Sequence, residues 1–89
     1  ITCMSVVKIF TSPNCPLCMI LKNFLSSIGV KYLEMDISNI NVMTELIMNN
    51  VFVTSVPILE VDGRYFFVND LFEDSKLRSE FILKILGRS

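Results

Sequence analysis

The stretch TSPNCPLC, residues 11–18, marks the point where an apolar run ends and an amphipathic helix is predicted to begin. Before it, residues 6–10 (VVKIF) are typical of a strand that is apolar on both faces except at Lys8. After it, apolar residues recur at the intervals of a helix that is buried along one side. They are Leu17, Ile20, Leu21, Phe24, Leu25 and Ile28. The pattern therefore places two cysteines, Cys15 and Cys18, at a helix N-terminus.

The N-terminus of a helix favours a reactive thiolate. The first-turn N–H groups lack partners within the helix, and the aligned peptide dipoles leave partial positive charge there. Pro16 suits the first helical position, with Asn14 or Cys15 as the cap. Cys18 lies almost one turn after Cys15 on the same face, so a disulfide between them is sterically reasonable. A C-x-x-C pair beside a βαβ pattern predicts a redox site.

A βαβ unit is predicted around this helix. The helix is expected over residues 16–28, with Gly29 as its stop, and a second strand is expected over residues 30–37. One crossover helix makes the two strands parallel and the connection right-handed. A second helix is then expected, capped by Ser38 or Asn41 and ended by the asparagines at 49–50. Its expected inner face carries Val42, Met43, Leu46 and Ile47.

Two strands and a last helix complete the predicted order. Strands are expected over residues 58–61 and 64–68, and the Asp-Gly pair at 62–63 predicts a hairpin between them, because a type I′ turn needs positive φ at both positions. A last helix is expected over residues 71–86, closed by Gly87. Its expected inner face carries Leu77, Phe81, Ile82, Ile85 and Leu86. The fold class is therefore α/β, with a four-stranded mixed sheet flanked by three helices.

Length and charge limit the kinds of function that are expected. The 89 residues suit one small domain, which we expect to span residues 1–89 as a monomer. Eight basic and nine acidic residues are interspersed, so neither nucleic acid nor an anionic membrane is an expected partner. The apolar stretches are broken before they reach the ~18 residues of a membrane span. Three cysteines with one close pair favour a soluble protein of the reducing cytoplasm.

The chain resembles a glutaredoxin or glutaredoxin-like protein of the thioredoxin superfamily over essentially its whole length. The resemblance rests on C-P-L-C at residues 15–18 after the first strand, on Val-Pro at residues 56–57 before the third strand, and on the compact order of elements. The family pattern C-P-Y-C has tyrosine where this chain has Leu17. The resemblance implies a thioredoxin-like fold, in the order βαβ-α-ββα.

The resemblance also implies a role for each motif residue. Cys15 would be the nucleophile and Cys18 the resolving thiol. Pro57 would be a cis-proline that faces them, and the backbone of Val56 would pair with a bound thiol peptide. The residues expected to contact the substrate are Pro16, Leu17, Lys22, Val56, Pro57 and Asp70.

Departures from the family pattern bear on the electron donor. Ser12 stands where many glutathione-using members have a lysine, three residues before the nucleophile, whereas Lys22 occupies a place where the family often has one. The Gly-Gly-x-Asp stretch that receives part of glutathione is replaced by FVND at residues 67–70, without the close backbone approach that glycines allow. Asp70 either matches the acidic residue of that stretch or caps the last helix. These differences favour a donor other than glutathione.

The predicted function is a thiol–disulfide oxidoreductase that reduces protein or low-molecular-weight disulfides, with a reductase or another thiol as its reductant. The Cys15 thiolate would attack a disulfide, and Cys18 would resolve the mixed disulfide. Because the chain has no histidine, thiolate formation must depend on the helix terminus, local hydrogen bonds and Lys8 or Lys22. No resident cofactor besides the cysteine pair is expected.

Metal binding is the alternative use of the same cysteines. A closed zinc site needs about four ligands, and only Cys3 could add a third sulfur within one chain. A zinc site or an iron–sulfur cluster shared by two chains would need only the C-x-x-C pair of each. The expected signs of this alternative are a zinc-loaded or coloured dimer.

Overall fold

The computed structural model describes residues 6–53, 55–74 and 76–87. Its main sheet has four strands in the order β2-β1-β3-β4. They are β1 (Val7–Thr11), β2 (Leu33–Asp36), β3 (Ile58–Val61) and β4 (Arg64–Phe66). Strand β1 runs parallel to β2 and antiparallel to β3, which in turn pairs antiparallel with β4. The predicted mixed sheet and its parallel βαβ unit are confirmed.

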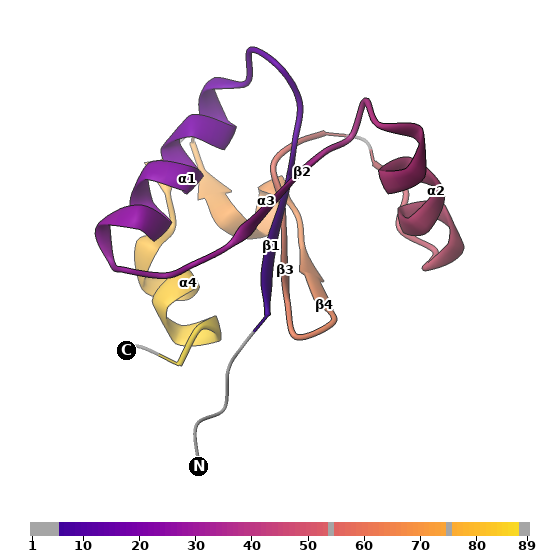
Figure 1. Cartoon of the computed structure of the whole chain (residues 1–89). Helices are drawn as coiled ribbons and strands as arrows, with labels where there is room; N and C mark the ends of the chain where they lie inside the picture. Colours follow the sequence, from indigo (N-terminus) through magenta and orange to yellow (C-terminus); the bar gives the residue numbers. More distant parts are fainter. Residues whose placement is uncertain (1–5, 54, 75, 88–89) are drawn as a thin grey trace.

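Helices cover both faces of this sheet (Figure 1). Helix α1 (Pro16–Ser27) and helix α4 (Ser79–Ile85) lie on one side, and helix α2 (Ile40–Met48) lies on the other. The central strands β1 and β3 carry buried apolar residues on both faces because each face meets a helical layer. The predicted three-layered α/β architecture is therefore confirmed.

The sheet separates two hydrophobic clusters. The larger cluster joins strand residues to α1, α4 and the segment between β4 and α4, and its buried members are Val7, Ile9, Leu21, Leu25, Leu59, Val61, Leu71, Phe72 and Ile82. The smaller cluster joins the opposite strand faces to α2 and to the loop that follows it, and its buried members are Phe10, Val42, Leu46, Val51 and Ile58. The alternation along β1, with Ile9 on one side and Phe10 on the other, follows the period of a strand.

The prediction of one continuous helix over residues 71–86 is wrong. The chain forms a short helix α3 (Val68–Leu71), a two-stranded hairpin of β5 (Phe72–Glu73) and β6 (Lys76–Leu77), and only then α4. Asp74 has φ 52°, a left-handed conformation that ends a helix and that aspartate tolerates better than most residues. The apolar spacing alone did not reveal this turn.

Burial along α4 also differs from the expected inner face. Ile82 is fully buried, and Leu77, Ile85 and Leu86 pack against the larger cluster as partly buried residues. Phe81 is only half-buried, and its ring meets that of Phe66 edge to face with centroids 5.8 Å apart. Ile82 is thus the residue that fixes α4 to the core.

Smaller differences concern the ends of the elements. The second strand covers residues 33–36 of the expected 30–37, and β4 ends at residue 66 and not at 68. The cap of α2 is Asn39, whose side chain accepts the N–H of Asn41 at 2.8 Å, and not Ser38 or Asn41. Ile47 points outward with 52% of its surface exposed. The Asp62-Gly63 hairpin is confirmed, with φ values of 51° and 85°. No helix among the described residues is long and apolar enough to cross a membrane.

Candidate active site

The site begins where β1 ends and α1 starts. Cys15 is the N-cap of α1, with an extended backbone at φ −106° and ψ 106°, and Pro16 follows as the first helical residue. Asn14 just before it has φ 58°, which turns the chain from the strand into the helix. The local sequence thus explains the placement, because proline fits the first turn and asparagine tolerates the left-handed region. The sequence allowed either Asn14 or Cys15 as the cap, and in the structure the cap is Cys15.

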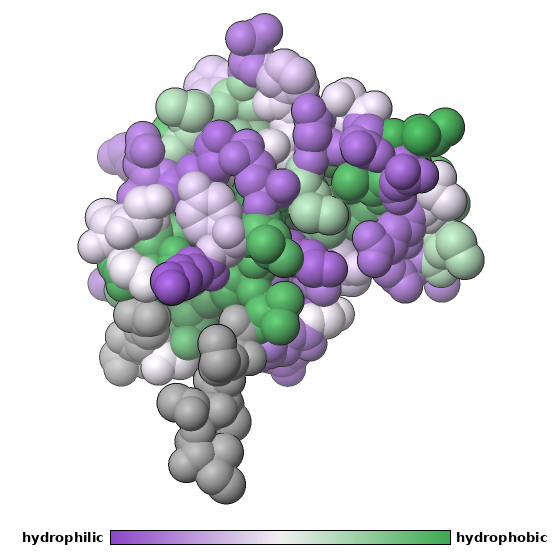
Figure 2. Space-filling view, in the orientation of Figure 1, coloured by the Kyte–Doolittle hydropathy of each residue, from purple (hydrophilic) through white to green (hydrophobic). Residues whose placement is uncertain are grey.

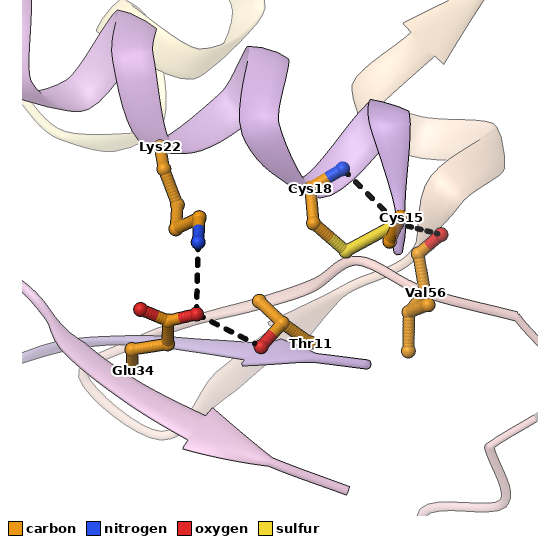
Figure 3. Close-up of a disulfide and its surroundings, with 6 residues drawn as sticks. All are labelled: Thr11, Cys15, Cys18, Lys22, Glu34 and Val56. Atoms are coloured by element: carbon orange, nitrogen blue, oxygen red, sulfur yellow. Dashed lines mark hydrogen bonds and ion pairs between the residues drawn. A yellow bond between two sulfur atoms is a disulfide. The ribbon is translucent and has the colours of Figure 1, made fainter. Parts of the chain in front are cut away.

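The two cysteines form a disulfide, so the structure shows the oxidised state of the pair (Figure 3). The backbone N–H of Cys18 donates a hydrogen bond of 3.1 Å to Cys15 Sγ. Cys15 is half-buried, whereas Cys18 is only 1% exposed. A disulfide-bearing partner can therefore reach the first sulfur and not the second. The N–H of Cys18 lies where it would stabilise negative charge on Cys15 after reduction.

The loop before β3 meets the disulfide from the other side. The carbonyl oxygen of Val56 lies 3.9 Å from Cys15 Sγ (Figure 3). The Val56–Pro57 peptide bond is cis, as the resemblance implied, and Pro57 is fully buried. Residues separated by 41 positions in the chain are thereby brought together at one sulfur.

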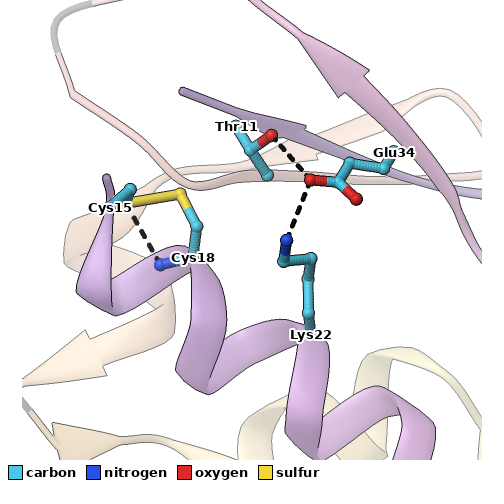
Figure 4. A network of polar contacts seen from close by, with 5 residues as sticks. All are labelled: Thr11, Cys15, Cys18, Lys22 and Glu34. Carbon is cyan, nitrogen blue, oxygen red and sulfur yellow. Dashed lines mark hydrogen bonds and ion pairs between the residues drawn. A yellow bond between two sulfur atoms is a disulfide. The ribbon is translucent and has the colours of Figure 1, made fainter. Parts of the chain in front are cut away.

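A polar network adjoins the disulfide, and two of its members were missed from sequence. Lys22 Nζ lies 2.9 Å from Glu34 Oε2 in an ion pair, and the buried Thr11 hydroxyl donates to the same oxygen at 3.2 Å (Figure 4). The hydrogen bond from Lys22 is the main cause that lowers the pKa of Glu34, with a smaller contribution from Thr11. Glu34 comes from β2, so only the parallel register of β1 and β2 places it beneath α1.

An open groove of about 720 Å³ runs along the disulfide and this network. Its lining includes Cys15, Pro16, Cys18, Lys22, Glu34 and Asp36. Asp36 is exposed, and hydrogen bonds from the backbone N–H and hydroxyl of Ser38 lower the pKa of its carboxyl. The groove therefore offers one accessible sulfur beside three charged side chains.

Not every residue predicted to contact the substrate lies at this groove. Leu17 is half-buried and packs against the larger hydrophobic cluster. The Oδ2 atom of Asp70 accepts the N–H of Phe67 at 3.1 Å, so this carboxylate caps α3. Pro16 and Lys22 do line the groove. Cys3 lies outside the described residues, and Lys8 sits half-buried in β1.

The described residues contain no group of three or more His, Cys, Asp or Glu side chains that could hold a metal ion. This finding concerns one chain and the ranges 6–53, 55–74 and 76–87. A metal shared between two chains through Cys15 and Cys18 stays a hypothesis.

Comparisons with known proteins agree with this geometry. Residues 7–66 match the family model described as Glutaredoxin, a range that runs from β1 to β4 and includes both cysteines and Pro57. No curated protein matches the chain.

Three solved structures illustrate the likeness in fold. A mutant of the thioredoxin-like protein BC3987 shares 23% identity and a TM-score of 0.67, with 90% of this chain and 97% of that chain covered. Glutaredoxin 1 from Francisella tularensis, complexed with cacodylate, shares 22% identity and a TM-score of 0.66, with coverages of 93% and 98%. NrdH-redoxin from Escherichia coli, a glutaredoxin-like protein with a thioredoxin-like activity profile, shares 14% identity and a TM-score of 0.63, with coverages of 89% and 92%.

Proposed function

The chain belongs to the glutaredoxin family, and from that premise we propose that it reduces protein or low-molecular-weight disulfides through Cys15 and Cys18. The observation that carries the proposal is the geometry of the pair. Cys15 is half-buried at the start of α1, and its sulfur is bonded to that of Cys18, a residue that is only 1% exposed. The Cys15 sulfur also accepts a hydrogen bond from the backbone N–H of Cys18 at 3.1 Å. This arrangement supports one attacking and one resolving thiol.

The cycle follows from these positions. In the reduced protein, the Cys15 thiolate attacks one sulfur of a disulfide, a new S–S bond forms, and the other sulfur leaves with the electron pair of the broken bond. Cys18 then loses its proton to water and attacks Cys15 Sγ, which releases the second substrate thiolate. Both leaving thiolates take up protons according to their pKa. The substrate disulfide ends as two thiols, and the protein ends as the disulfide seen here.

The surroundings of Cys15 support a substrate with a peptide character. The Val56 carbonyl lies 3.9 Å from the sulfur, and this proximity supports pairing of the Val56 backbone with an extended segment that carries the target disulfide. Pro16 is exposed and lines the groove on the helix side. Pro57 is buried and contributes by shaping the loop. Substrate contact is thus proposed for Pro16 and the Val56 backbone.

The donor that we propose is a reductase or a thiol other than glutathione. Asp70 caps α3 through a 3.1 Å hydrogen bond with the N–H of Phe67, so its carboxylate is already engaged. The residues before it, Phe67 and Val68, bring side chains where the family pattern has glycines. A dithiol that must be re-reduced after every turnover needs a reducing compartment, and the proposed one is the cytoplasm.

Alkylation and mass spectrometry test the roles of the two cysteines. Cys15→Ser is expected to abolish reduction of hydroxyethyl disulfide, and Cys18→Ser is expected to trap a mixed disulfide on Cys15. A mixed disulfide on Cys18 in the Cys15→Ser variant, or none on Cys15 in the Cys18→Ser variant, would refute the assigned roles. The metal alternative gains support if the wild-type pair never forms a disulfide in glutathione redox buffers and the protein purifies with zinc or iron.

A glutathione adduct on Cys15 tests the proposed donor. If the adduct forms and resolves rapidly in wild-type protein, glutathione is a competent donor and that part of the proposal fails. If the pair is reduced by dithiothreitol and does not respond to glutathione, the proposal stands.

A further inference from the structure

The ion pair between Lys22 and Glu34 is held in place from three elements. Lys22 comes from the second turn of α1, Glu34 from β2, and the hydroxyl of Thr11 at the end of β1 donates to the same Glu34 oxygen (Figure 4). Thr11 is 4% exposed, and the side chains of Lys22 and Glu34 are 22% and 46% exposed. The Glu34 carboxylate accepts from both partners and is thereby held in place, so the Lys22 ammonium that pairs with it is drawn toward β2.

This pairing decides the charge that a substrate meets. Within the described part of the chain, the charged side chains that line the groove are Lys22, Glu34 and Asp36. Lys22 is the sole cation among them, and its ammonium is bonded to Glu34. The groove beside Cys15 therefore presents one net negative charge and no free cation. Anions approaching such a groove are repelled, and cations are attracted.

We propose that Glu34 is a specificity-determining residue, which holds Lys22 away from the substrate and so disfavours anionic disulfides such as glutathione disulfide relative to neutral or cationic ones. This inference rests on the proposed function and names its substrate class. The favoured substrates are disulfides flanked by basic or uncharged groups. The reaction itself is the exchange described above, with dithiothreitol as the reductant that restores the two thiols.

Three disulfides of different charge test the proposal. The reduced protein is mixed with glutathione disulfide, a dianion at neutral pH, with neutral hydroxyethyl disulfide, or with cystamine, a dication. Rates of Cys15–Cys18 disulfide formation are measured at low ionic strength by quenching with an alkylating agent. Rates with the neutral disulfide serve as the reference, because a general change in thiol reactivity alters all three rates alike.

Glu34→Gln should release the ammonium of Lys22 into the groove. The rate ratio of glutathione disulfide to cystamine is then expected to rise about three- to ten-fold, and the rise should fade near 1 M salt, where the screening length is about 3 Å. Asp36→Asn is the matched control, since it removes the same charge from the same strand and leaves Lys22 paired. It should raise the ratio less than Glu34→Gln does.

The double variant Lys22→Gln/Glu34→Gln shows whether the effect passes through the ammonium. Its ratio is expected to return close to the wild-type value, because the groove regains the same net charge. The proposal is overturned if Glu34→Gln and Asp36→Asn change the ratio equally, or if Glu34→Gln changes all three rates by one factor. Wild-type protein that reduces none of the three disulfides, so that Cys15 and Cys18 both stay reduced, would instead refute the proposed function.

Discussion

The two faces of the sheet are covered unequally. Among the residues that the structure describes, nine buried ones form the cluster beneath α1 and α4, whereas five form the cluster beneath α2. Helix α2 also leaves three large apolar side chains outside, with Ile40 at 77%, Ile47 at 52% and Met48 at 78% exposure. Apolar atoms accordingly reach the surface on the side of α2 (Figure 2). The face with the larger core is the one that carries α1, the helix that begins at Cys15 and contains Cys18.

This difference explains how the site is held. Cys18, Leu21 and Leu25 follow one another on the buried side of α1, and none of them is more than 1% exposed. The position of Cys18 is thus fixed by the same packing that fixes the helix. No residue of α2 lines the groove at the disulfide. Damage to the α2 face should therefore lower stability and spare the chemistry.

The largest expected effect is on the α1 face. Leu25→Ala removes a fully buried side chain from the larger cluster, and we expect the free energy of unfolding to fall by about 4 kcal/mol. Urea denaturation of the oxidised protein, followed by circular dichroism, measures the loss. The exposed neighbour Ser26 supplies the control, since Ser26→Ala should stay within about 0.5 kcal/mol of wild type. A loss below 2 kcal/mol at Leu25 would show that this cluster can relax around a cavity.

The equivalent change on the α2 face should cost less. Leu46 is 1% exposed, so Leu46→Ala removes the same atoms from a similarly buried position. Leu46 lies in the smaller cluster, under a single helix whose outer side is exposed, so the cavity can collapse more readily. We therefore expect the free energy of unfolding to fall by about 2.5 kcal/mol. The rate of hydroxyethyl disulfide reduction should stay unchanged in the folded variant. A lower rate, or a loss greater than that at Leu25, would remove the distinction between the two faces.

The βαβ unit and the segment between β4 and α4 differ in how far the sequence revealed them. The βαβ unit was predictable because each boundary has a local signal, namely Pro16 at the start of α1, Gly29 after its end and β-favouring residues on both sides. The segment over residues 67–78 has no such signals, and its helical spacing hid a hairpin that turns at Asp74. Here the buried pair Leu71 and Phe72 selects the backbone through tertiary packing.

The candidate site shows a similar division. Cys15 and Cys18 could be found because their spacing and the helix start are both local features. Glu34 could not be found, because its role depends on the register that sets it opposite Ile9 in β1, and on the reach of Lys22 across from α1. The two carboxylates of β2 at positions 34 and 36 were nevertheless a usable signal. Alternation in a strand places both on the same side.

The smallest expected effect is the pH-dependent contribution of the Lys22–Glu34 ion pair to the free energy of unfolding. The hydrogen bond from Lys22 lowers the pKa of Glu34 below its ordinary value of 4.5 in the folded protein. A carboxyl with a depressed folded pKa stabilises the fold above its unfolded pKa, and this contribution is lost as the pH falls through the folded value. Because the Glu34 side chain is 46% exposed, we expect less than about 1 kcal/mol at pH 7.

Lys22→Gln isolates this contribution from that of other carboxyl groups. At pH 7 the variant should be slightly less stable than wild type in urea, and the difference should shrink as the pH falls and Glu34 becomes protonated in both proteins. Asp36 supplies the internal control, because the pKa of its carboxyl is lowered by Ser38 and not by Lys22, so its contribution is common to both proteins. A stability difference that stays constant from pH 7 to pH 3 would mean that Lys22 acts through the packing of its aliphatic stem on α1 and not through its charge.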